Sequence, residues 1–377
     1  MRRALIACGG TGGHLAPGIA LAEELSSRGW ECKLLISGKQ VDSILVQKYT
    51  QFKYEAIAGS GLSFHPVKLF RFLRDLLNGY RSCGRIIRSS GPELVVGFGG
   101  FISASALLAG ARNGVPVAIH EANQIPGRVT RLTSRFASRV YLPNGAVLKE
   151  AKKDCIRNVG MPLRTEFERR SKGEAKRVLG FDPDKKLLLV FGGSQGALAL
   201  NEWAKQHSRI LNENQIQLMC LTGMSGGCSE SATIDSDEAA QSKTIFMEFS
   251  EQMAILLSAA DLAISRAGAG SIAELIRCRV PAILVPYPYA ADNHQLFNAQ
   301  RFVTQGGGVL CQQEEIKSLL NIALDMISSD EKRNRLTENL EAMDQSNSQS
   351  EIADDLERLA TITKDGQKEA LEVTQCQ

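Results

Sequence analysis

Residues 3–14 read RALIACGGTGGH, and residues 187–197 read LLLVFGGSQGA. Each stretch is a short apolar run that ends in a glycine-rich turn and leads into an amphipathic segment. That order is typical of a buried strand, a tight turn and a helix. Because the same pattern begins each half of the chain, the sequence predicts two domains that start in the same way.

Further strands alternate with helical patterns after each of these stretches, such as 15–28 and 103–113. The expected strands are nearly continuous apolar runs, as in parallel sheets covered on both faces. They are Leu5–Cys8, Lys33–Ile36, Leu94–Val96, Val117–His120, Leu187–Phe191, Gln217–Leu221, Thr244–Met247, Leu262–Ser265 and Ala282–Val285. The alternation predicts an α/β protein with two Rossmann-like, doubly wound parallel sheets.

The domain boundary is expected between residues 162 and 163, where Gly160 and Pro162 interrupt both periodicities. The first domain is therefore predicted to span residues 1–162 and the second residues 163–342. The stretch 225–243 is polar and is expected to be a surface excursion. A helical pattern over about 343–363 is expected to pack back on the first domain, and residues 364–377 are predicted to form a disordered tail.

Length and composition agree with a soluble protein of two domains. At 377 residues the chain exceeds one ordinary core of about 150 residues, and the net charge of +3 favours no particular partner. The nine cysteines include no C-x-x-C pair, which favours a reducing compartment over a zinc site or a disulfide framework. No stretch approaches the roughly 20 apolar residues that a spanning helix needs.

The glycine turns predict ligands that carry phosphate, because backbone N–H groups and the start of a helix attract anions. Glycines that serve packing alone remain the structural alternative. A nicotinamide-dependent oxidoreductase is disfavoured, since the sixth position of GGTGGH is His14 and the second strand ends without an acid, at Ser37-Gly38-Lys39. Neither turn matches the P-loop of NTPases, and a non-catalytic nucleotide-binding module would leave the polar groups around the turns without a role.

Seven blocks between residue 9 and about residue 300 carry a family resemblance. They are Gly9–His14 (GGTGGH), Gly97–Phe101 (GFGGF), His120–Asn123 (HEAN), Pro162–Arg164 (PLR), Gly192–Ala197 (GGSQGA), Ser265–Leu275 (SRAGAGSIAEL) and Val285–Ala299 (VPYPYAADNHQLFNA). In their order and spacing they resemble the MurG family of inverting glycosyltransferases, which have the GT-B architecture of two Rossmann-like domains facing across a cleft.

The resemblance implies transfer of N-acetylglucosamine (GlcNAc) from UDP-GlcNAc to a muramyl-pentapeptide on undecaprenyl pyrophosphate, the step from lipid I to lipid II in peptidoglycan synthesis. It further implies a peripheral protein on the cytoplasmic face of the bacterial inner membrane, with no cofactor. A GT-B transferase that acts on another membrane glycolipid is the alternative. Asp235 and Asp237 form the D-x-D pattern of metal-dependent transferases, but they lie in the polar excursion and are read as solvated acids. No metal is therefore expected.

Carried over to this sequence, the family's donor site lies in the second domain. Phe249 and Ser250 would read the uracil, Ser194 would hold the diphosphate, and Glu274 would accept hydrogen bonds from the ribose hydroxyls. Gln295, with His294 beside it, would contact the sugar. The remaining expected donor-site residues are Arg164 and the helix start Ala269, Gly270 and Ser271.

The acceptor would be held in the first domain, with His14 as the candidate catalytic base, because imidazole titrates near working pH. His120 and Glu121 are the competing candidates. The other expected contacts are Thr11, Gly12, Gly13 and Asn123, and an acceptor loop of Gly99, Gly100 and Phe101. The chain departs from the family pattern at three positions, which are Met161 for Asn, Ala122 for Gln and Phe101 for Tyr.

Residues 65–88 combine arginines with large apolar side chains. Arg71, Arg74, Arg81, Arg85 and Arg88 fall on one stripe of a helical projection. Amphipathic, arginine-rich segments bind anionic membrane surfaces, whereas a core helix with a solvated basic face is the plain alternative. Nucleic acid is not expected as a partner, because no nucleic-acid-binding motif accompanies the stripe.

Overall fold

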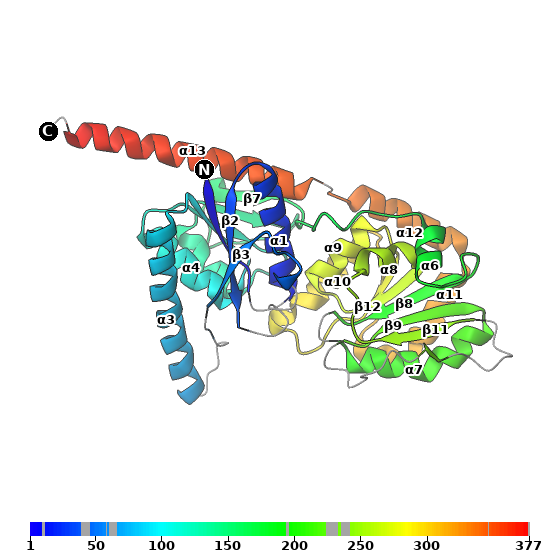
Figure 1. The fold of residues 1–377 in the computed structure, drawn as a ribbon. Helices are drawn as coiled ribbons and strands as arrows, with labels where there is room; N and C mark the ends of the chain where they lie inside the picture. The colour runs from blue at the N-terminus through cyan, green and yellow to red at the C-terminus, as the bar shows by residue number, and fades with distance from the viewer. Residues whose placement is uncertain are drawn as a thin grey trace. The chain divides into compact units, whose positions relative to one another are not determined.

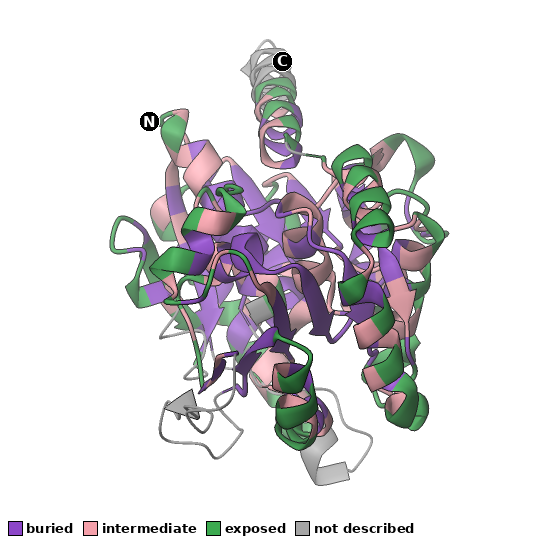
Figure 2. Cartoon of the chain, turned by 90° about the vertical axis from the view of Figure 1, so that its right-hand side faces the viewer, coloured by how far each residue is buried: buried purple, intermediate pink, exposed green. Residues whose placement is uncertain are grey.

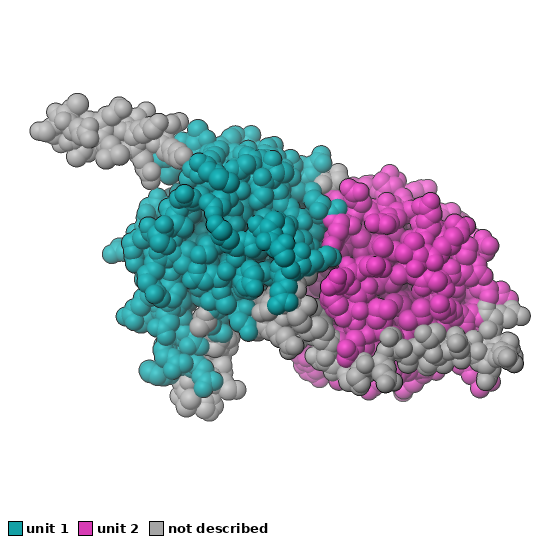
Figure 3. All heavy atoms as spheres, viewed as in Figure 1, with its two compact units in different colours: residues 1–165, 345–377 teal, residues 166–344 magenta. Residues whose placement is uncertain are grey.

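The computed structural model describes residues 1–9, 12–38, 46–57, 59, 66–193, 196–223, 233–234, 242–345 and 347–375. The chain divides into two compact units (Figure 3). Unit 1 comprises residues 1–165 and 345–377, and unit 2 comprises residues 166–344. Within the described ranges, no helix combines the length and the apolar character needed to cross a lipid bilayer.

Unit 1 contains a seven-stranded sheet whose described pairings are all parallel. Its strands are β1 (Arg3–Ala7), β2 (Glu31–Ser37), β3 (Lys53–Ile57), β4 (Leu94–Gly97), β5 (Val117–His120), β6 (Arg139–Leu142) and β7 (Ile156–Asn158). Its helices are α1 (Gly12–Ser27), α3 (Pro66–Ser90), α4 (Gly100–Arg112), α5 (Arg128–Thr133) and α13 (Ser348–Gln375), with single 3-10 turns η1 (Ser134–Phe136) and η2 (Lys153–Cys155). The strand order is β3-β2-β1-β4-β5-β6-β7.

Helices cover both faces of this sheet (Figure 1). On one face, Ile6 of β1 shares a core with Leu15 of α1 and Ile352 of α13. On the other face, Leu5 packs with Ile86 of α3 and with α4. Both faces are therefore dry, which explains why the central strands are apolar at successive positions rather than at alternate ones.

The return of the chain to unit 1 through α13 is fixed by a buried carboxylate. Asp355 accepts hydrogen bonds from Arg139 Nε at 2.9 Å and from the Tyr141 hydroxyl at 3.0 Å. Burial, and then the charge of Asp355, raises the pKa of Tyr141 above its usual value. Arg28, directly after α1, adds an ion pair with Glu357 at 3.1 Å.

Helix α13 continues to Gln375, into the stretch for which the sequence predicts a disordered tail. Residues 364–375 contain no proline and consist largely of strong helix formers, so local propensity continues the helix beyond its packed part.

Unit 2 repeats the architecture with the order β10-β11-β9-β8-β12-β13-β14, in which only the short β10 is antiparallel to its neighbour. Its strands are β8 (Lys186–Phe191), β9 (Ile216–Leu221), β10 (Thr233–Ile234), β11 (Thr244–Met247), β12 (Leu262–Ser265), β13 (Ala282–Leu284) and β14 (Gly308–Leu310). Its helices are α6 (Lys172–Val178), α7 (Leu198–Glu213), α8 (Met253–Ala259), α9 (Ala269–Arg277), α10 (His294–Thr304), α11 (Leu319–Ser328) and α12 (Asp330–Met343), with η3 (Ala291–Asn293) and η4 (Gln313–Ser318). Buried residues concentrate in the strands of both sheets (Figure 2).

Candidate functional site

In unit 1 the chain reverses its direction of winding between β1 and β4. From β1 it proceeds outward through β2 to β3, and it then returns to place β4 on the other side of β1. In doubly wound sheets, ligands bind at such a reversal, outside the carboxyl ends of the strands. The turns after β1 and β4 are the GGTGGH and GFGGF blocks, so the strand order brings together two motifs about 90 residues apart.

His14 lies where these two turns meet. A methyl group built on Gly99 would be only 3.0 Å from His14 Nε2, and one built on Gly100 would be 3.5 Å from Nδ1. Both glycines have positive φ, 91° and 71°, a conformation that side chains disfavour. Ser103 joins α4 to β1 by donating to Ala7 O at 2.8 Å. The backbone conformation therefore favours glycine at residues 99 and 100, and at residue 99 glycine also leaves room for the half-exposed imidazole.

His120 ends β5 and is buried, with only 3% of its surface exposed. Burial is the main cause that lowers the pKa of His120 to about 4, with a smaller lowering from His14, while Glu121 and a backbone hydrogen bond at Gly160 oppose the shift. Its ring packs 5.2 Å from Phe98, centroid to centroid. At neutral pH His120 is an uncharged core residue, and its burial makes it a poorer candidate for the base than His14.

Glu121 is also buried, and both of its carboxylate oxygens are used. Oε1 accepts from Asn123 N and Asn123 Nδ2, each at 3.0 Å. Oε2 accepts from Gly127 N at 2.8 Å and from the Thr130 hydroxyl at 2.7 Å. This carboxylate holds the loop between β5 and α5 and orients Asn123, which makes it a positioning residue rather than a proton acceptor.

Further predicted residues belong to unit 1, including Arg164, which was expected at the donor site. The Phe101 ring lies within 2 Å of the position that a methyl group on Gly59 would take, and it meets Phe72 edge-on at 6.4 Å. Arg164 Nη1 donates to the Tyr49 hydroxyl at 3.2 Å. Gly12 begins α1, with Gly13 next to it, whereas Thr11 lies outside the described residues.

Unit 2 reverses its winding between β8 and β12, and the turns after these strands again carry glycine-rich blocks. A methyl group on Gly192 would lie 2.4 Å from Ala197 N, and one on Gly196 would lie 2.0 Å from Thr222 O. Gly193 and Gly196 have φ of 84° and 80°. Only glycine fits this tight turn into α7. Ser194, predicted to hold the diphosphate, lies outside the described residues.

The turn after β12 leads into α9 through Gly268, the N-cap of the helix. Ala269, Gly270 and Ser271 form its first turn, where the backbone N–H groups have no acceptor inside the helix. Glu274 follows within the same helix and is half-buried, as are these three residues. The first turn of α9 therefore presents donors suited to an anion, with a carboxylate one turn further on.

Arg266, in the same turn, is a residue that the sequence reasoning missed. It is 8% exposed, its Nη1 donates to Val285 O at 3.1 Å and Pro286 O at 3.2 Å, and its Nη2 donates to Gln313 Oε1 at 2.6 Å. Its guanidinium also lies 5.5 Å from the Tyr287 ring centroid. Burial lowers its pKa from the usual value. An arginine directly after a buried strand was the available signal.

Arg266 supports the loop that carries the predicted sugar contacts. Gln295 Oε1 accepts from Tyr287 N at 3.0 Å, which leaves the Gln295 amide nitrogen as the donor end of the group. His294 begins α10, and its Nδ1 lies 2.7 Å from Ala291 O. Asn293, before it, has a left-handed φ of 53°, so the chain turns sharply into α10 here.

The predicted uracil contacts follow β11. Phe249 is 42% exposed, and the Ser250 hydroxyl accepts from Gln252 N at 3.1 Å. Thr222 N donates to Met247 O at 2.8 Å, which holds the end of β11 beside that of β9. The structure thus places 249–250, the glycine turn after β8, the start of α9 and Gln295 at the carboxyl ends of strands of one sheet.

Metal ligation by Asp235 and Asp237 falls outside the described residues. In the described part of the chain, no three His, Cys, Asp or Glu side chains gather closely enough to hold a metal ion. The seven described cysteines are free thiols.

Residues 4–142 match the glycosyltransferase family 28 N-terminal domain, and residues 187–356 match the family 28 C-terminal domain. The UDP-N-acetylglucosamine–N-acetylmuramyl-(pentapeptide) pyrophosphoryl-undecaprenol N-acetylglucosamine transferase of Opitutus terrae is 46% identical over 355 residues, 94% of each chain. Its namesake from Parasynechococcus marenigrum is 40% identical over 322 residues, 84% of each chain. The chain belongs to the MurG family. The family expected from the seven sequence blocks is thereby confirmed, and with it a glycosyltransferase.

Solved structures confirm the fold expected for the MurG family. A crystal structure of Acinetobacter baumannii MurG superposes with a TM-score of 0.70, at 23% identity over 95% of this chain and 100% of that one. A UDP-GlcNAc 2-epimerase from Neisseria meningitidis also superposes, with a TM-score of 0.68 at 14% identity over 94% of this chain and 100% of that one. At these identities the likeness concerns the fold alone, which is GT-B.

Proposed function

We propose that this chain transfers GlcNAc from UDP-GlcNAc to the muramyl-pentapeptide on undecaprenyl pyrophosphate, with inversion at the anomeric carbon. The relatives that carry this activity in their names match nearly the whole chain, at up to 46% identity. The observation that carries the proposal is that each sheet has glycine-rich turns on both sides of its winding reversal. A transferase needs two such sites, one for a nucleotide-sugar and one for an acceptor that also bears phosphate.

Unit 2 is the proposed donor site. The first-turn amides of α9 and those of the turn after β8 would hold the diphosphate. Glu274 would accept from the ribose hydroxyls, and the Gln295 amide would donate to the sugar. As UDP departs, the same amides would stabilise the negative charge that develops on it, so the proposal assigns leaving-group stabilisation to the protein backbone.

Unit 1 is the proposed acceptor site, with His14 as base. The acceptor hydroxyl would attack the anomeric carbon, the bond from that carbon to the UDP oxygen would break, and the hydroxyl proton would pass to the imidazole. The support is geometric, because His14 is half-exposed at the meeting point of two glycine turns, whereas His120 is buried and Glu121 is fully hydrogen-bonded.

Donor use is tested by incubating the pure protein with UDP-GlcNAc and a short-chain muramyl-pentapeptide pyrophosphate lipid, and identifying the product by mass. Glu274→Ala should weaken UDP-GlcNAc binding, because a buried hydroxyl that loses its partner costs about 1–3 kcal/mol. Glu251→Ala, outside the predicted contacts, is the matched control. Equal calorimetric affinity of the wild type for UDP-GlcNAc and UDP-glucose would contradict the donor assignment.

The base is tested by the pH dependence of turnover. His14→Gln should lower kcat by about 10²–10⁴ and abolish the acidic limb of the pH–rate profile, while UDP-GlcNAc binding changes little. A variant that keeps the acidic limb and loses only acceptor affinity would show that His14 binds phosphate rather than moving a proton.

We also propose that α3 docks the protein on the anionic, cytoplasmic face of the inner membrane. Phe70, Leu73 and Leu77 are exposed by 72%, 54% and 48%, which is unusual for large apolar side chains. Arg71 and Arg74 are exposed among them. Apolar groups beside basic ones suit the interface between headgroups and acyl chains. Phe70→Ser should reduce sedimentation with vesicles, and unchanged sedimentation would refute the docking.

A further inference from the structure

Arg266 is a buried cation at the edge of the unit 2 sheet, and the proposed donor contacts do not use it. Its side chain belongs to a residue that is only 8% exposed. Within the described residues no carboxylate forms an ion pair with it, and its printed partners are neutral oxygens. A buried charged group needs acceptors inside the protein, because leaving a donor unpaired there is costly. Removing one of these acceptors should therefore move the guanidinium.

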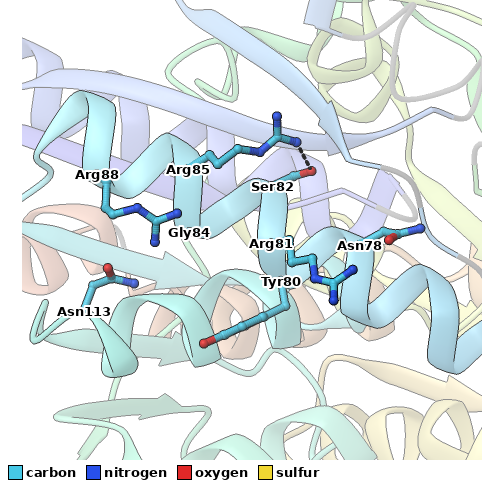
Figure 4. A pocket seen from close by; sticks show the side chains of 8 residues that line it. All are labelled: Asn78, Tyr80, Arg81, Ser82, Gly84, Arg85, Arg88 and Asn113. Atoms are coloured by element: carbon cyan, nitrogen blue, oxygen red, sulfur yellow. Dashed lines mark hydrogen bonds between the residues drawn. The ribbon is translucent and has the colours of Figure 1, made fainter.

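The arginines of α3 are not constrained in this way. Arg81, Arg85 and Arg88 line an open pocket of about 540 Å³, and all three are exposed (Figure 4). Arg85 donates to the Ser82 hydroxyl at 3.1 Å. Water can take the place of such an acceptor at an exposed guanidinium. At the buried Arg266, by contrast, each acceptor supplied by the protein matters.

The acceptors of Arg266 lie at the carboxyl ends of neighbouring strands. Arg266 itself follows β12, and its Nη1 donates to Val285 O and Pro286 O, directly after β13. Its Nη2 donates to Gln313 Oε1 at 2.6 Å, and Gln313 begins η4 shortly after β14. Since β12, β13 and β14 are adjacent in the sheet, the guanidinium ties the turn after β13 to the turn after β14.

One of these acceptors belongs to the peptide group that also orients Gln295. Pro286 O accepts from Arg266 at 3.2 Å. Tyr287 N, at the other end of the same peptide group, donates to Gln295 Oε1 at 3.0 Å. A peptide group is planar and rigid, so its C=O and its N–H move together. Whatever fixes the Pro286 carbonyl therefore also fixes the Gln295 amide.

Gln313 is the side chain that holds the other end of this guanidinium. The Nη1 atom of Arg266 is held by backbone carbonyls, whereas its Nη2 atom is held by the half-buried Gln313 amide. A hydrogen bond from a charged donor is stronger than one between neutral groups. The position of Arg266 therefore depends on a residue that lies outside the predicted donor contacts.

We propose that Gln313 is a positioning residue for the sugar of the donor. It acts through Arg266 and the peptide group between Pro286 and Tyr287, and it sets the orientation in which the Gln295 amide meets the hexosamine. The inference rests on the proposed contact between Gln295 and the sugar. Because this route ends at the sugar, Gln313 should matter for UDP-GlcNAc and not for UDP alone.

The first measurement compares the calorimetric affinities of Gln313→Ala for UDP-GlcNAc and for UDP. The dissociation constant for UDP-GlcNAc should rise about tenfold, because a charged donor loses one partner, while that for UDP should change less than about twofold. Gln312→Ala shortens the exposed neighbouring side chain, and this matched control should bind both ligands like wild type. Equal weakening of both ligands by Gln313→Ala, or no weakening of either, would overturn the proposal. Retained UDP binding also shows that the variant is folded.

Gln313→Glu tests whether the hydrogen bond itself is the cause. Glutamate keeps an acceptor oxygen on a side chain of the same length. The ratio of UDP-GlcNAc affinity to UDP affinity should therefore return to that of the wild type. A ratio like that of Gln313→Ala would mean that the lost acceptor does not explain the effect, and the proposed role would fail.

A double-mutant cycle tests the route through Gln295. Gln295→Ala alone should weaken UDP-GlcNAc binding and spare UDP binding. In that background Gln313→Ala should add a loss of less than about twofold, because the amide on which it acts is gone. A further loss of about tenfold would show that Gln313 acts independently of Gln295 and would refute the route. If Gln295→Ala binds UDP-GlcNAc like wild type, the proposed sugar contact itself is wrong, which distinguishes its failure from that of the Gln313 role.

Discussion

The buried imidazole of His120 should make unit 1 sensitive to mild acid. Its pKa is lowered from about 6.5 to about 4, chiefly by burial. Between these values the unfolded chain binds a proton that the folded chain does not, so the free energy of unfolding decreases as the pH falls through this window. One pKa unit corresponds to about 1.4 kcal/mol, so lowering the pH from 7 to 5 should cost unit 1 about 2 kcal/mol, and about 3 kcal/mol should be lost below pH 4.

The chain offers a clean assay, because its two tryptophans, Trp30 and Trp203, lie in different units. In a Trp203→Phe background, fluorescence reports the urea unfolding of unit 1 through Trp30. Between pH 7 and pH 5, the free energy of unfolding of unit 1 should fall by about 2 kcal/mol less in His120→Gln than in its parent. His207→Gln, which removes an imidazole from unit 2, should behave like the parent. If the free energy of unfolding depends on pH in the same way in His120→Gln and in its parent, the reasoning is refuted, since some other group then causes the acid sensitivity.

Four further outcomes are expected. Glu121→Gln should raise the acceptor KM and leave UDP-GlcNAc affinity unchanged in calorimetry, because an amide nitrogen cannot accept the hydrogen bonds that Oε2 accepts now. Asp355→Asn should destabilise unit 1 by about 3 kcal/mol in urea unfolding, while the exposed neighbour variant Asp354→Asn should change stability by less than about 1 kcal/mol. Gly79→Ala should lower the thermal midpoint despite its better helix propensity, and Gly84→Ala should raise it. Activity should survive exhaustive treatment with EDTA, and turnover that requires added magnesium would contradict amide stabilisation of UDP.

Several strands at the edges of the sheets were not predicted from the sequence. β3 was not predicted, because its residues are mostly exposed and do not form an apolar run. β7 and β14 are three residues each, too short to show a period. Central strands such as β5 and β12 are buried throughout and were found at their observed bounds. The apolar pattern of the sequence reports burial. It therefore identifies the central strands, which helices cover on both faces, and misses the strands at the edges of the sheet.

Part of the candidate site could likewise be predicted from the sequence, and part of it could not. The glycine turns and the polar residues near them could be named from sequence because each motif is local, and a strand, a turn and a helix start suffice to define it. The role of Glu121 could not be predicted from the sequence. Its carboxylate accepts four hydrogen bonds from residues up to nine positions away, and only the folded loop brings these donors together. Arg266 was missed because its partners at Val285, Pro286 and Gln313 belong to other elements.

By itself the sequence determined that the chain has two parallel-sheet domains, that each opens with a glycine-rich turn after its first strand, and that its motif blocks are those of the MurG family. Only the tertiary structure decided that His14 meets Gly99 and Gly100, that His120 is a buried neutral residue, and that α3 carries an open basic pocket. The physical reason is the range of the interactions. Turns and strands follow from neighbouring residues, whereas strand order, burial and the packing of α3 on α4 depend on contacts between residues that are distant in the chain.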